Sequence, residues 1–281
     1  MPFRSSSTPA NSEQDYRCFR EFLENCCGIV LGENKNYLID SRLRKIVRDN
    51  EITSLTELVR KIDSSSISSL RQKVIDAMTT NETLWFRDGH PFEHFSGELL
   101  PELSEGGQPL KIWCAASSSG QEPYTISICA EEYKKRNISK PFRDVSIVAT
   151  DICTEILDQA KAGEYEMLSL NRGMSNERLK RHFSEIQQGR WKINPEIQRR
   201  VEFKQFNLKD SFSTLGRFDV VFCRNVLIYF STELQSQILR NIHSVLKPGG
   251  YLYLGGSEGP RGLDEYFKVC YYTPGVFYKK K

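Results

Sequence analysis

The chain has 281 residues, and its 39 Lys and Arg against 36 Asp and Glu give a formal net charge of +3. This length suits about two domains, and the near balance of charge disfavours a protein that coats DNA, which carries a large basic excess. No run of about 18 apolar residues is present, so no transmembrane helix and no membrane insertion are predicted. The polar start lacks the apolar stretch of a signal peptide, and we expect a cytoplasmic protein.

Segment 1–14 is rich in Ser, Thr, Pro and Asn and is predicted to be disordered. From there to residue 80, apolar residues recur at helical spacing and no strand pattern is found. Residues 15–80 are therefore predicted to be a small all-helical domain, followed by a linker and junction helix at 81–108. The helices of the domain are expected around residues 19–26, 43–47, 55–62 and 67–78.

Beyond residue 108, short apolar runs alternate with helical segments. This alternation is typical of a mostly parallel, doubly wound α/β sheet, which we place at 109–281. FKVCYY and GVFYKK near the end are expected to form a closing antiparallel hairpin. The preceding strands are expected at 110–116, 146–152, 218–225 and 251–256, with helices at 122–136, 154–162 and 234–245.

One stretch breaks the alternation. It contains a helical piece, NERLKRHF, and then WKI and VEFKQF, which are interpreted as strands with Asn194-Pro195 as a turn between them. We therefore predict a small β-subdomain, inserted at about 163–206 on the edge of the sheet.

The eight cysteines do not follow a metal-binding or redox spacing. None forms a C-x-x-C pair, and most lie inside apolar runs such as KIWCAA (111–116) and VVFCRN (220–225). We expect reduced thiols in the core of a cytosolic protein and no metal site.

Ligands of an open α/β sheet bind outside the carboxyl ends of its strands. The first strand ends in small residues (115–120) that allow close approach, and the second ends in Asp151, a carboxylate suited to ribose hydroxyls. The competing role for Asp151 is to cap the next helix, a role that Thr154 could also take. No G-x-G-x-x-G motif is present. A nucleotide-like ligand without a phosphate-binding loop suggests S-adenosylmethionine, which has adenine and ribose but no phosphates.

Four segments resemble the CheR family of chemotaxis-receptor methyltransferases: TTNETLWFRDGHPF (79–92), WCAASSSGQEPYTIS (113–127), VATDI (148–152) and CRNVLIYF (223–230). LKPGGYLYLGGSE (246–258) supports them, and the resemblance extends from about residue 15 to the end. It implies a helical domain followed by a Rossmann-like class I methyltransferase domain with a β-subdomain. It also implies that S-adenosylmethionine is the cofactor, with S-adenosylhomocysteine as product. The expected reaction is methylation of glutamate side chains on cytoplasmic helices of bacterial chemoreceptors, a step of chemotaxis signal transduction.

The resemblance also implies the residues that contact the cofactor. Asp151 suits the ribose and Glu122 the cationic end, while the pairs at 207–208 and 225–226 suit adenine and the neighbourhood of the methyl group. Arg224 is a weaker candidate for the methionine carboxylate, and plain packing is the alternative for the leucine and valine of the two pairs. The complete set is Asn81, Thr83, Arg87, Glu122, Asp151, Asn207, Leu208, Asn225 and Val226.

A glutamate acceptor has an unperturbed pKa of about 4.3, so it is ionised near pH 7 and needs no general base. Its carboxylate must be aimed at the methyl group for in-line transfer. Arg87 is expected to clamp the carboxylate with its planar fork, and the Tyr229 hydroxyl to orient the second oxygen. The alternatives are a surface ion pair for Arg87 and a core position for Tyr229.

Four basic residues on one predicted helix suggest how the substrate is bound. Arg42, Arg44, Lys45 and Arg48 are expected to dock on an acidic receptor helix, with a solvated helix face as the alternative. Some family members also hold a peptide tether of the receptor through a longer, Gly-rich loop of the β-subdomain. Here only SEIQQGR separates His182-Phe183 from WKI, so we expect a protein that needs no tether. We also expect a monomer.

The motifs disfavour three other classes of protein. Amino-methylating nucleic-acid enzymes carry D/N-P-P-Y/F where this chain has Asn225-Val226-Leu227-Ile228, and no Pro-Cys pair of a cytosine methyltransferase exists, so we expect no nucleic-acid substrate. The missing glycine motif disfavours a nicotinamide dehydrogenase. A non-catalytic module that senses the cofactor is disfavoured by the presence of Arg87 and Tyr229.

Overall fold

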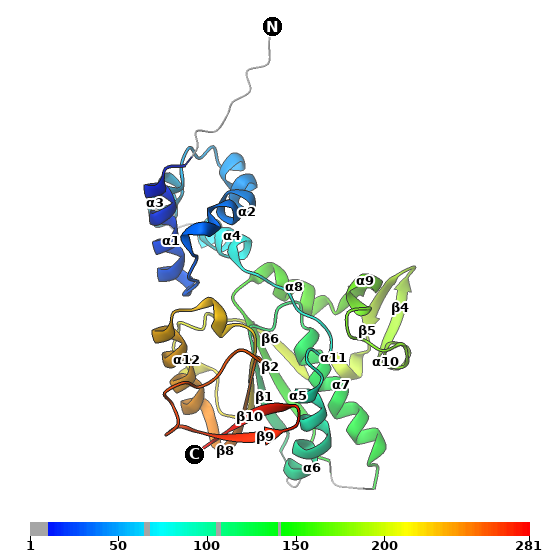
Figure 1. The fold of residues 1–281 in the computed structure, drawn as a ribbon. Helices are drawn as coiled ribbons and strands as arrows, with labels where there is room; N and C mark the ends of the chain where they lie inside the picture. Colours follow the sequence, from blue (N-terminus) through cyan, green and yellow to red (C-terminus); the bar gives the residue numbers. More distant parts are fainter. Residues whose placement is uncertain (1–10, 65–67, 105–107, 140–141) are drawn as a thin grey trace. The chain divides into compact units, whose positions relative to one another are not determined.

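A computed structural model describes residues 11–64, 68–104, 108–139 and 142–281. It separates into two units (Figure 1). The first is helical, ends at Thr80 and also includes Tyr229–Ser231. The second is formed by Asn81–Ile228 and Thr232–Lys281.

The N-terminal unit contains the predicted helices. Helix α1 packs against α3, and α2 packs against α4, so that one apolar stripe of each faces its neighbours. Phe19, Leu43 and Leu58 are buried in this way. The helices are α1 (Glu13–Cys27), α2 (Asn36–Asp49), α3 (Leu55–Ser64) and α4 (Ser68–Met78), with a 3₁₀ turn, η1 (Glu33–Lys35), before α2.

Disorder is predicted for residues 1–14, but residues 13 and 14 belong to helix α1, so the end of that prediction is wrong. Residues 1–10 lie outside the described part of the chain. Helix α1 begins at Glu13 because Ser12 and Asp15 form a capping box. The Asp15 amide donates to the Ser12 hydroxyl at 3.2 Å, and the Asp15 carboxylate accepts from the Ser12 amide at 3.0 Å. The Ser12 hydroxyl also donates to the Asp15 carboxylate, and this hydrogen bond is the main reason why the pKa of Asp15 lies below its usual range. Composition misled here because the serines that favour disorder also favour helix N-caps.

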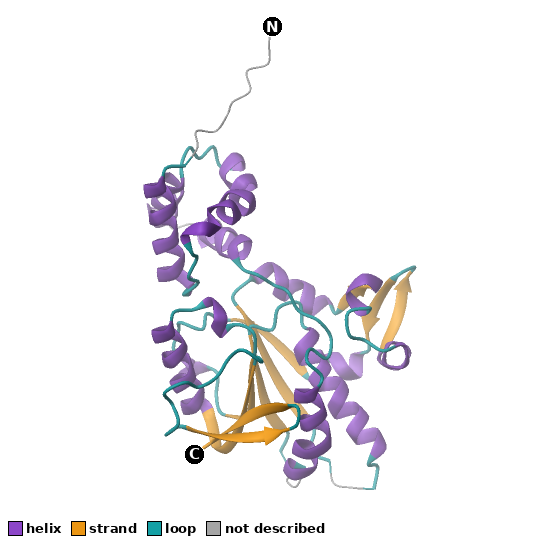
Figure 2. Cartoon of the chain, in the orientation of Figure 1, coloured by secondary structure: helices purple, strands orange, loops and turns teal. Residues whose placement is uncertain are grey.

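The second unit is built on a seven-stranded sheet in the order β6-β2-β1-β7-β8-β10-β9 (Figure 2). The first five strands are parallel to one another, and β10 runs antiparallel to both β8 and β9. This confirms the mostly parallel α/β sheet and its closing hairpin. The strands are β1 (Leu110–Ala115), β2 (Val145–Asp151), β6 (Val201–Gln205), β7 (Phe218–Cys223), β8 (Leu246–Leu254), β9 (Phe267–Tyr272) and β10 (Gly275–Lys280).

Helices cover both faces of this sheet. In Figure 1, α5 (His90–His94) and α7 (Gln121–Arg136) lie on one side of the sheet and α12 (Thr232–Val245) on the other. Helix α8 (Thr154–Ala162) packs against β2 and β6, and α6 (Leu100–Leu103) follows α5 through a π-helical turn. The central strands are therefore buried on both faces, which explains why they are continuous apolar runs in the sequence.

The β-subdomain is a separate three-stranded antiparallel sheet in the order β3-β5-β4. Its helices are α9 (Met167–Leu170) and α10 (Asn176–His182), and its strands are β3 (Glu164–Glu166), β4 (Phe183–Gln187) and β5 (Arg190–Ile193). The turn between β4 and β5 is only two residues long, 188–189. That the protein needs no receptor tether stays a prediction.

Three details of the predicted insertion are wrong. VEFKQ is strand β6, which pairs in parallel with β2 in the main sheet, and Asn194-Pro195 opens a short helix, α11 (Pro195–Gln198). SEIQ (184–187), taken as part of a loop, belongs to strand β4. The errors about β4 and β6 have one cause: both strands lie at sheet edges and are largely exposed, so their residues do not reveal which sheet they join.

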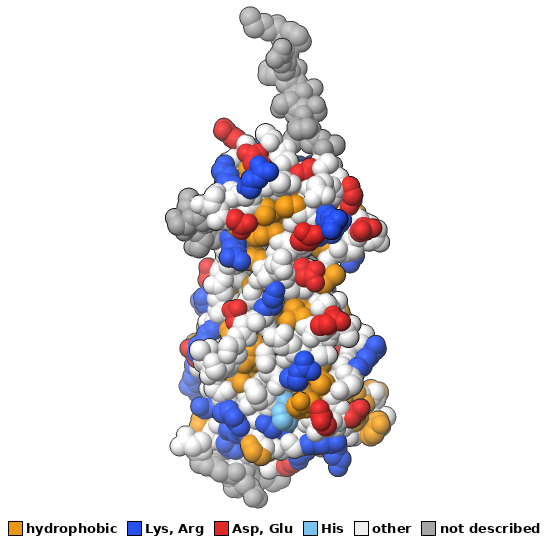
Figure 3. Space-filling model, turned by 90° about the vertical axis from the view of Figure 1, so that its left-hand side faces the viewer, with side chains coloured by type: hydrophobic (Ala, Val, Ile, Leu, Met, Phe, Trp, Pro, Cys, Tyr) orange, Lys and Arg blue, Asp and Glu red, His pale blue; other side chains and the backbone are white. Residues whose placement is uncertain are grey.

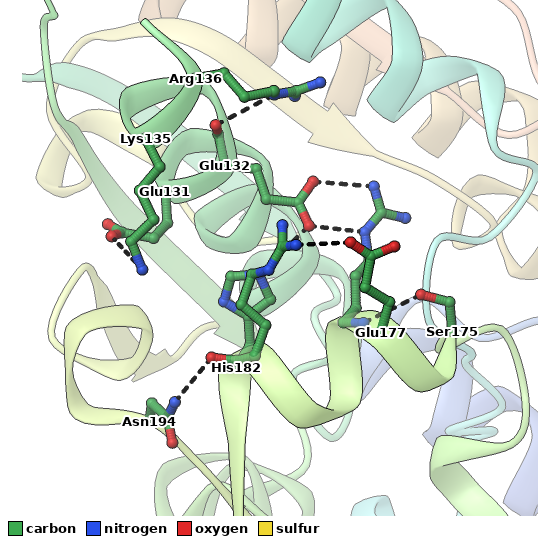
Figure 4. A network of polar contacts seen from close by, with 10 residues as sticks. Glu131, Glu132, Lys135, Arg136, Ser175, Glu177, His182 and Asn194 are labelled. Atoms are coloured by element: carbon green, nitrogen blue, oxygen red, sulfur yellow. Dashed lines mark hydrogen bonds and ion pairs between the residues drawn. The ribbon is translucent and has the colours of Figure 1, made fainter. Parts of the chain in front are cut away.

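Helix α10 is tied to α7 by a polar network (Figure 4). Glu132 of α7 accepts two hydrogen bonds from Arg178, at 2.9 and 3.1 Å, and lies 3.3 Å from Nε2 of His182. Burial alone would raise the pKa of Glu132, but the hydrogen bonds from His182 and Arg178 outweigh it and lower the pKa to about 2. The carboxylate is therefore ionised at neutral pH, and it holds the β-subdomain to the main sheet by charge-assisted bonds.

On the face drawn in Figure 3, acidic and basic side chains are interspersed, as the near-neutral composition leads us to expect. Across the described ranges, no helix combines the length and apolar character that crossing a bilayer requires.

Gly173 provides a test of how the β-subdomain is attached. Its φ is +105°, and a Cβ there would collide with the carbonyl oxygen of Trp85, whereas Gly189 has φ +76° and open space around it. We expect Gly173→Ala to lower the free energy of unfolding by about 3 kcal/mol, because backbone strain adds to overpacking. Gly189→Ala, the matched control, should cost about 1 kcal/mol from strain alone. Urea denaturation measures both, and equal losses would contradict the collision with Trp85.

Candidate functional site at the carboxyl edge of the sheet

The five parallel strands end at one edge of the sheet, and most of the predicted site residues follow these ends. Asp151 ends β2, residues 116–120 connect β1 to α7, residues 207–208 follow β6, and residues 225–226 follow β7. This is the edge at which open α/β sheets bind their ligands.

The turn between β1 and α7 is bent by three left-handed residues. Ala116, Ser118 and Gly120 have φ of +54°, +49° and +92°. The first two carry side chains, so the conformation has a steric cost that the surroundings must offset. At Gly120 a Cβ would lie 3.1 Å from both the Tyr124 ring and the Tyr165 hydroxyl, which leaves little room for any side chain.

This turn brings Asn81 and Asp151 together. The Ser118 amide donates to Oδ2 of Asp151 at 2.8 Å, and its hydroxyl donates to the backbone oxygen of Asn81 at 2.8 Å. The other carboxylate oxygen of Asp151 accepts from the Cys153 amide at 3.0 Å, so Asp151 organises the backbone on both sides. No side-chain cap is found at the N-terminus of α8, where Cys153 stands. The ribose contact of Asp151 stays a prediction.

The residues after β6 reach the same place. The Phe206 amide donates to the backbone oxygen of Asp151 at 2.9 Å. The next residue, Asn207, therefore lies near the end of β2. The Asn207 side-chain oxygen accepts from the Lys209 amide at 3.1 Å, and Leu208 is buried. Packing therefore occupies the Leu208 side chain, which leaves its backbone groups for any cofactor contact.

A buried arginine connects two further segments of the site. Arg224, whose side chain is 1% exposed, donates to Glu122 at 2.8 Å and to Asp88 at 2.6 Å. It also donates to the backbone oxygen of Arg87 at 3.0 Å. Burial raises the pKa of Glu122, and the charge and hydrogen bond of Arg224 oppose that rise. In the structure, Arg224 forms ion pairs with two carboxylates of the protein, Glu122 and Asp88. Its contact with the methionine carboxylate stays a prediction.

Arg87 lies in a tight turn between two left-handed residues, Phe86 with φ +49° and Asp88 with φ +68°. Its side chain is half-buried and makes one long hydrogen bond, 3.5 Å, to the backbone oxygen of Glu82. The described part of the chain places no carboxylate within ion-pair distance of Arg87, so the surface ion pair is not found. Its charge nevertheless opposes the rise that burial causes in the pKa of Glu122, as expected of nearby groups. Thr83 is half-buried in the irregular segment that leads to this turn.

The loop after β7 is shaped by Glu258, which we did not predict as a site residue. Asn225 is left-handed, with φ +59°. Glu258 Oε2 accepts from the amides of Asn225 (2.8 Å) and Gly255 (2.7 Å), and Oε1 accepts from the Leu227 amide at 2.8 Å. A Cβ at Gly255 would lie 2.6 Å from the same carboxylate, so only glycine fits there. The one sequence signal was the Gly-Gly-Ser-Glu run after β8.

Two predicted groups lie in the N-terminal unit. Tyr229 belongs to it through its backbone oxygen, which accepts from the Val30 amide at 2.9 Å, and the pairing of Tyr229 with Arg87 stays a prediction. Arg42 is partly used by the fold. It donates to the backbone oxygens of Met78 (2.7 Å) and Thr79 (2.9 Å) and so caps the end of α4. Arg44, Lys45 and Arg48 remain exposed on α2.

All eight cysteines are free thiols, and six of them are buried. Burial raises the pKa of Cys129 to about 12 and keeps its thiol protonated. Over the described ranges, no group of three or more His, Cys, Asp or Glu side chains could hold a metal ion.

The residues at this edge fit S-adenosylmethionine. Glu122 is a largely buried carboxylate, 14% exposed, beside the strained turn, and the cofactor carries cationic sulfonium and amino groups. Within the same turn, the Ser117 hydroxyl is buried and has no hydrogen-bond partner in the part of the chain that the structure describes. An acid at the end of β2 and no phosphate-binding glycine loop complete the pattern. The fold and this edge together define a Rossmann-like methyltransferase.

Comparison with known proteins narrows the class. Residues 81–276 match the profile of the CheR methyltransferase SAM-binding domain, and residues 14–79 match that of the CheR methyltransferase all-alpha domain. Chemotaxis protein methyltransferase 1 of Pseudomonas aeruginosa is 52% identical over 269 residues, covering 95% of this chain and 98% of the relative. Chemotaxis protein methyltransferase Cher2 of Pseudomonas putida is 50% identical over 269 residues, with the same coverage. Chemotaxis protein methyltransferase of Vibrio anguillarum is 48% identical over 272 residues, covering 96% and 98%.

The chain therefore belongs to the CheR methyltransferase family, and its cofactor is S-adenosylmethionine.

Glu258 provides a test of this site. In Glu258→Gln an amide NH₂ faces one of the three backbone N–H donors, so the loop at 225–227 should lose its left-handed conformation. We expect the affinity for S-adenosylhomocysteine, measured by calorimetry, to fall about tenfold, the effect of losing one charge-assisted contact. Glu265→Gln, at an exposed carboxylate seven residues further on, is the matched control and should bind as the wild type does. Equal affinities of the two variants would contradict the role of Glu258.

Proposed function

We propose that this protein methylates glutamate side chains on cytoplasmic helices of chemoreceptors, forming methyl esters in chemotaxis adaptation. The observation that carries the proposal is the Arg87 guanidinium. It is half-buried at the cofactor edge and held by a left-handed turn, and none of the described carboxylates forms an ion pair with it. A fork-shaped cation in that state suits an incoming carboxylate. The names of the relatives, chemotaxis protein methyltransferases, agree with this acceptor.

When bound, S-adenosylmethionine supplies the methyl group to the acceptor oxygen, and its sulfur keeps the electron pair of the broken bond. A glutamate acceptor is already ionised near pH 7, so the protein needs no general base. Its task is to position the acceptor and remove water from it. Holding two reactants in line can lower a barrier by roughly 7–11 kcal/mol.

Each proposed residue has a distinct part in that positioning. Arg87 holds one oxygen of the acceptor, and the hydroxyl of Tyr229, four residues after Asn225 in the chain, orients the other. Glu122 balances the positive charge of the cofactor, while Arg224 keeps Glu122 in place through its 2.8 Å contact. The remaining cofactor contacts are assigned to Asn81, Thr83, Asp151, Asn207, Leu208, Asn225 and Val226.

Arg87→Ala and Tyr229→Phe test the acceptor site. We expect each to lower kcat about a hundredfold, because a mispositioned acceptor loses most of the benefit of proximity. In Tyr229→Phe the affinity for S-adenosylhomocysteine, measured by calorimetry, should stay within about threefold, a small change in free energy. Arg87 is also an expected cofactor contact, so in Arg87→Ala the affinity should fall, but by less than kcat does. Turnover is read as base-labile methyl groups transferred from labelled cofactor to receptor fragments, since an ester is cleaved by mild alkali.

The matched controls are Arg261→Ala and Tyr271→Phe, which change exposed side chains and should keep wild-type turnover. Wild-type turnover in Arg87→Ala or Tyr229→Phe would overturn the assignment of that residue.

The exposed cations of α2 are proposed to dock on the acidic receptor helix. Reversing two of them, in Arg44→Glu/Lys45→Glu, should raise KM for the receptor about tenfold at low ionic strength, because electrostatic steering is lost. The difference should shrink in about 0.5 M salt, where the Debye length is only a few ångströms. Arg60→Glu, which reverses an exposed arginine on α3, is the control. Unchanged methylation by the double variant at low salt would contradict the docking role of α2 and would support the alternative, a solvated helix face.

A further inference from the structure

The segment 85–88, which carries Arg87, is attached to the β-subdomain. The Trp85 ring is fully buried and packs edge-on against Tyr165 and Phe183, with ring centroids 4.9 and 5.4 Å apart. Its amide donates to the backbone oxygen of Arg172 at 3.0 Å. Tyr165 and Phe183 belong to strands β3 and β4, so the segment depends on a sheet inserted about 80 residues or more further along the chain.

Arg178 of α10 makes the second attachment. Its guanidinium carbon lies 3.9 Å from the centroid of the Phe86 ring, a cation–π contact with the residue that precedes Arg87. The same guanidinium is held by both carboxylate oxygens of Glu132, which also contacts His182 (Figure 4). Arg178 thus links α7, the β-subdomain and the segment of Arg87 through one rigid planar group.

The other end of the segment is attached to the main sheet. Arg224 binds the Asp88 carboxylate at 2.6 Å and the backbone oxygen of Arg87 at 3.0 Å. Among the described residues, the Arg87 side chain makes one hydrogen bond, its long contact with the backbone oxygen of Glu82. The position of its guanidinium therefore depends on the anchors at Phe86 and Asp88.

We propose that Arg178 is a positioning residue for Arg87, and that the β-subdomain acts as a clamp that keeps the segment 85–88 in its left-handed conformation. The inference rests on the proposed function in one respect, that Arg87 holds the acceptor. Left-handed residues with side chains persist only where surrounding contacts hold them, and Phe86 and Asp88 are two such residues. A catalytic group must also stay within a fraction of an ångström of its productive place. Loss of the clamp should therefore reduce turnover without weakening the binding of the cofactor.

Arg178→Gln removes the cation over Phe86 and the fork that Glu132 holds. We expect kcat to fall about tenfold or more, as for a catalytic group displaced by part of an ångström, with KM for S-adenosylmethionine within about twofold. Hydrogen exchange of the amides at 85–88 should become faster, since their anchor is lost. The matched control is Arg181→Gln on the same helix, an exposed arginine whose side chain forms an ion pair with Glu177, and it should change neither quantity.

Arg178→Gln leaves His182 as the remaining partner of the Glu132 carboxylate and can destabilise the fold, so Arg178→Gln/Glu132→Gln, which removes both charges, is measured beside it. Phe86→Leu, which keeps an apolar side chain but removes the ring face, should reproduce the loss of kcat, and adding Arg178→Gln to it should cause little further loss. If Arg178 merely stabilises the fold, the two losses add and exchange at 85–88 stays slow. That result, or wild-type kcat in the folded variants, overturns the proposal.

The exchange measurement separates this proposal from the proposed function. If the wild-type protein transfers no base-labile methyl groups to receptors, the function fails, yet exchange at 85–88 still reports whether Arg178 holds the segment. If Arg87→Ala is inactive while Arg178→Gln exchanges and turns over as the wild type does, the clamp fails and the function stands.

Discussion

The site depends on one buried cation. Arg224 is almost completely removed from water and is held by Glu122 on α7 and Asp88 on the segment before α5. Removing one partner of a buried ion pair costs about 3–5 kcal/mol, because the other charge stays behind without compensation. The end of β7, the start of α7 and the turn at Arg87 are therefore tied to a single guanidinium, and none of them can shift without breaking a charged contact. A site of this kind keeps its shape while the cofactor enters and leaves.

Carboxylates also organise the loops at the strand ends. Asp151 accepts two backbone amides beside the turn after β1, and Glu258 accepts three beside the loop after β7. In both places the neighbouring backbone is left-handed, at Ser118 and at Asn225. A carboxylate that gathers several amides offsets the local strain, since each such bond is stronger than one between neutral groups. The hydrogen bonds to these carboxylates offset the cost of the left-handed backbone and hold the loops in place. The edge is therefore organised for ligand binding before any ligand arrives.

The sequence predicted what short-range patterns encode. Central strands such as β1 and β7 are buried on both faces, so their residues form apolar runs, and Asp151 follows directly from the end of one run. The failures have a different origin. Strands β4 and β6 are exposed edge strands, and their pairing is decided by partners that the local pattern does not contain. Glu258 acts on Asn225 across 33 residues and Arg224 on Asp88 across 136, and no local spacing connects such pairs. Arg42 lies in a basic cluster that suggests docking, but its cap on α4 follows only from the folded helices.

The two halves of the proposed chemistry are supported in different ways. The cofactor edge is built from loops that follow neighbouring strands of one sheet, so its geometry follows from the sheet itself. The turn at Arg87 follows no strand and has two side-chain-bearing residues in left-handed conformations, so contacts from elsewhere must maintain it. Trp85 and Phe86 find those contacts on the β-subdomain, and Asp88 finds its contact on the main sheet. The β-subdomain, an insertion that looks peripheral in the chain, therefore supports the turn that carries Arg87, the residue proposed to hold the acceptor.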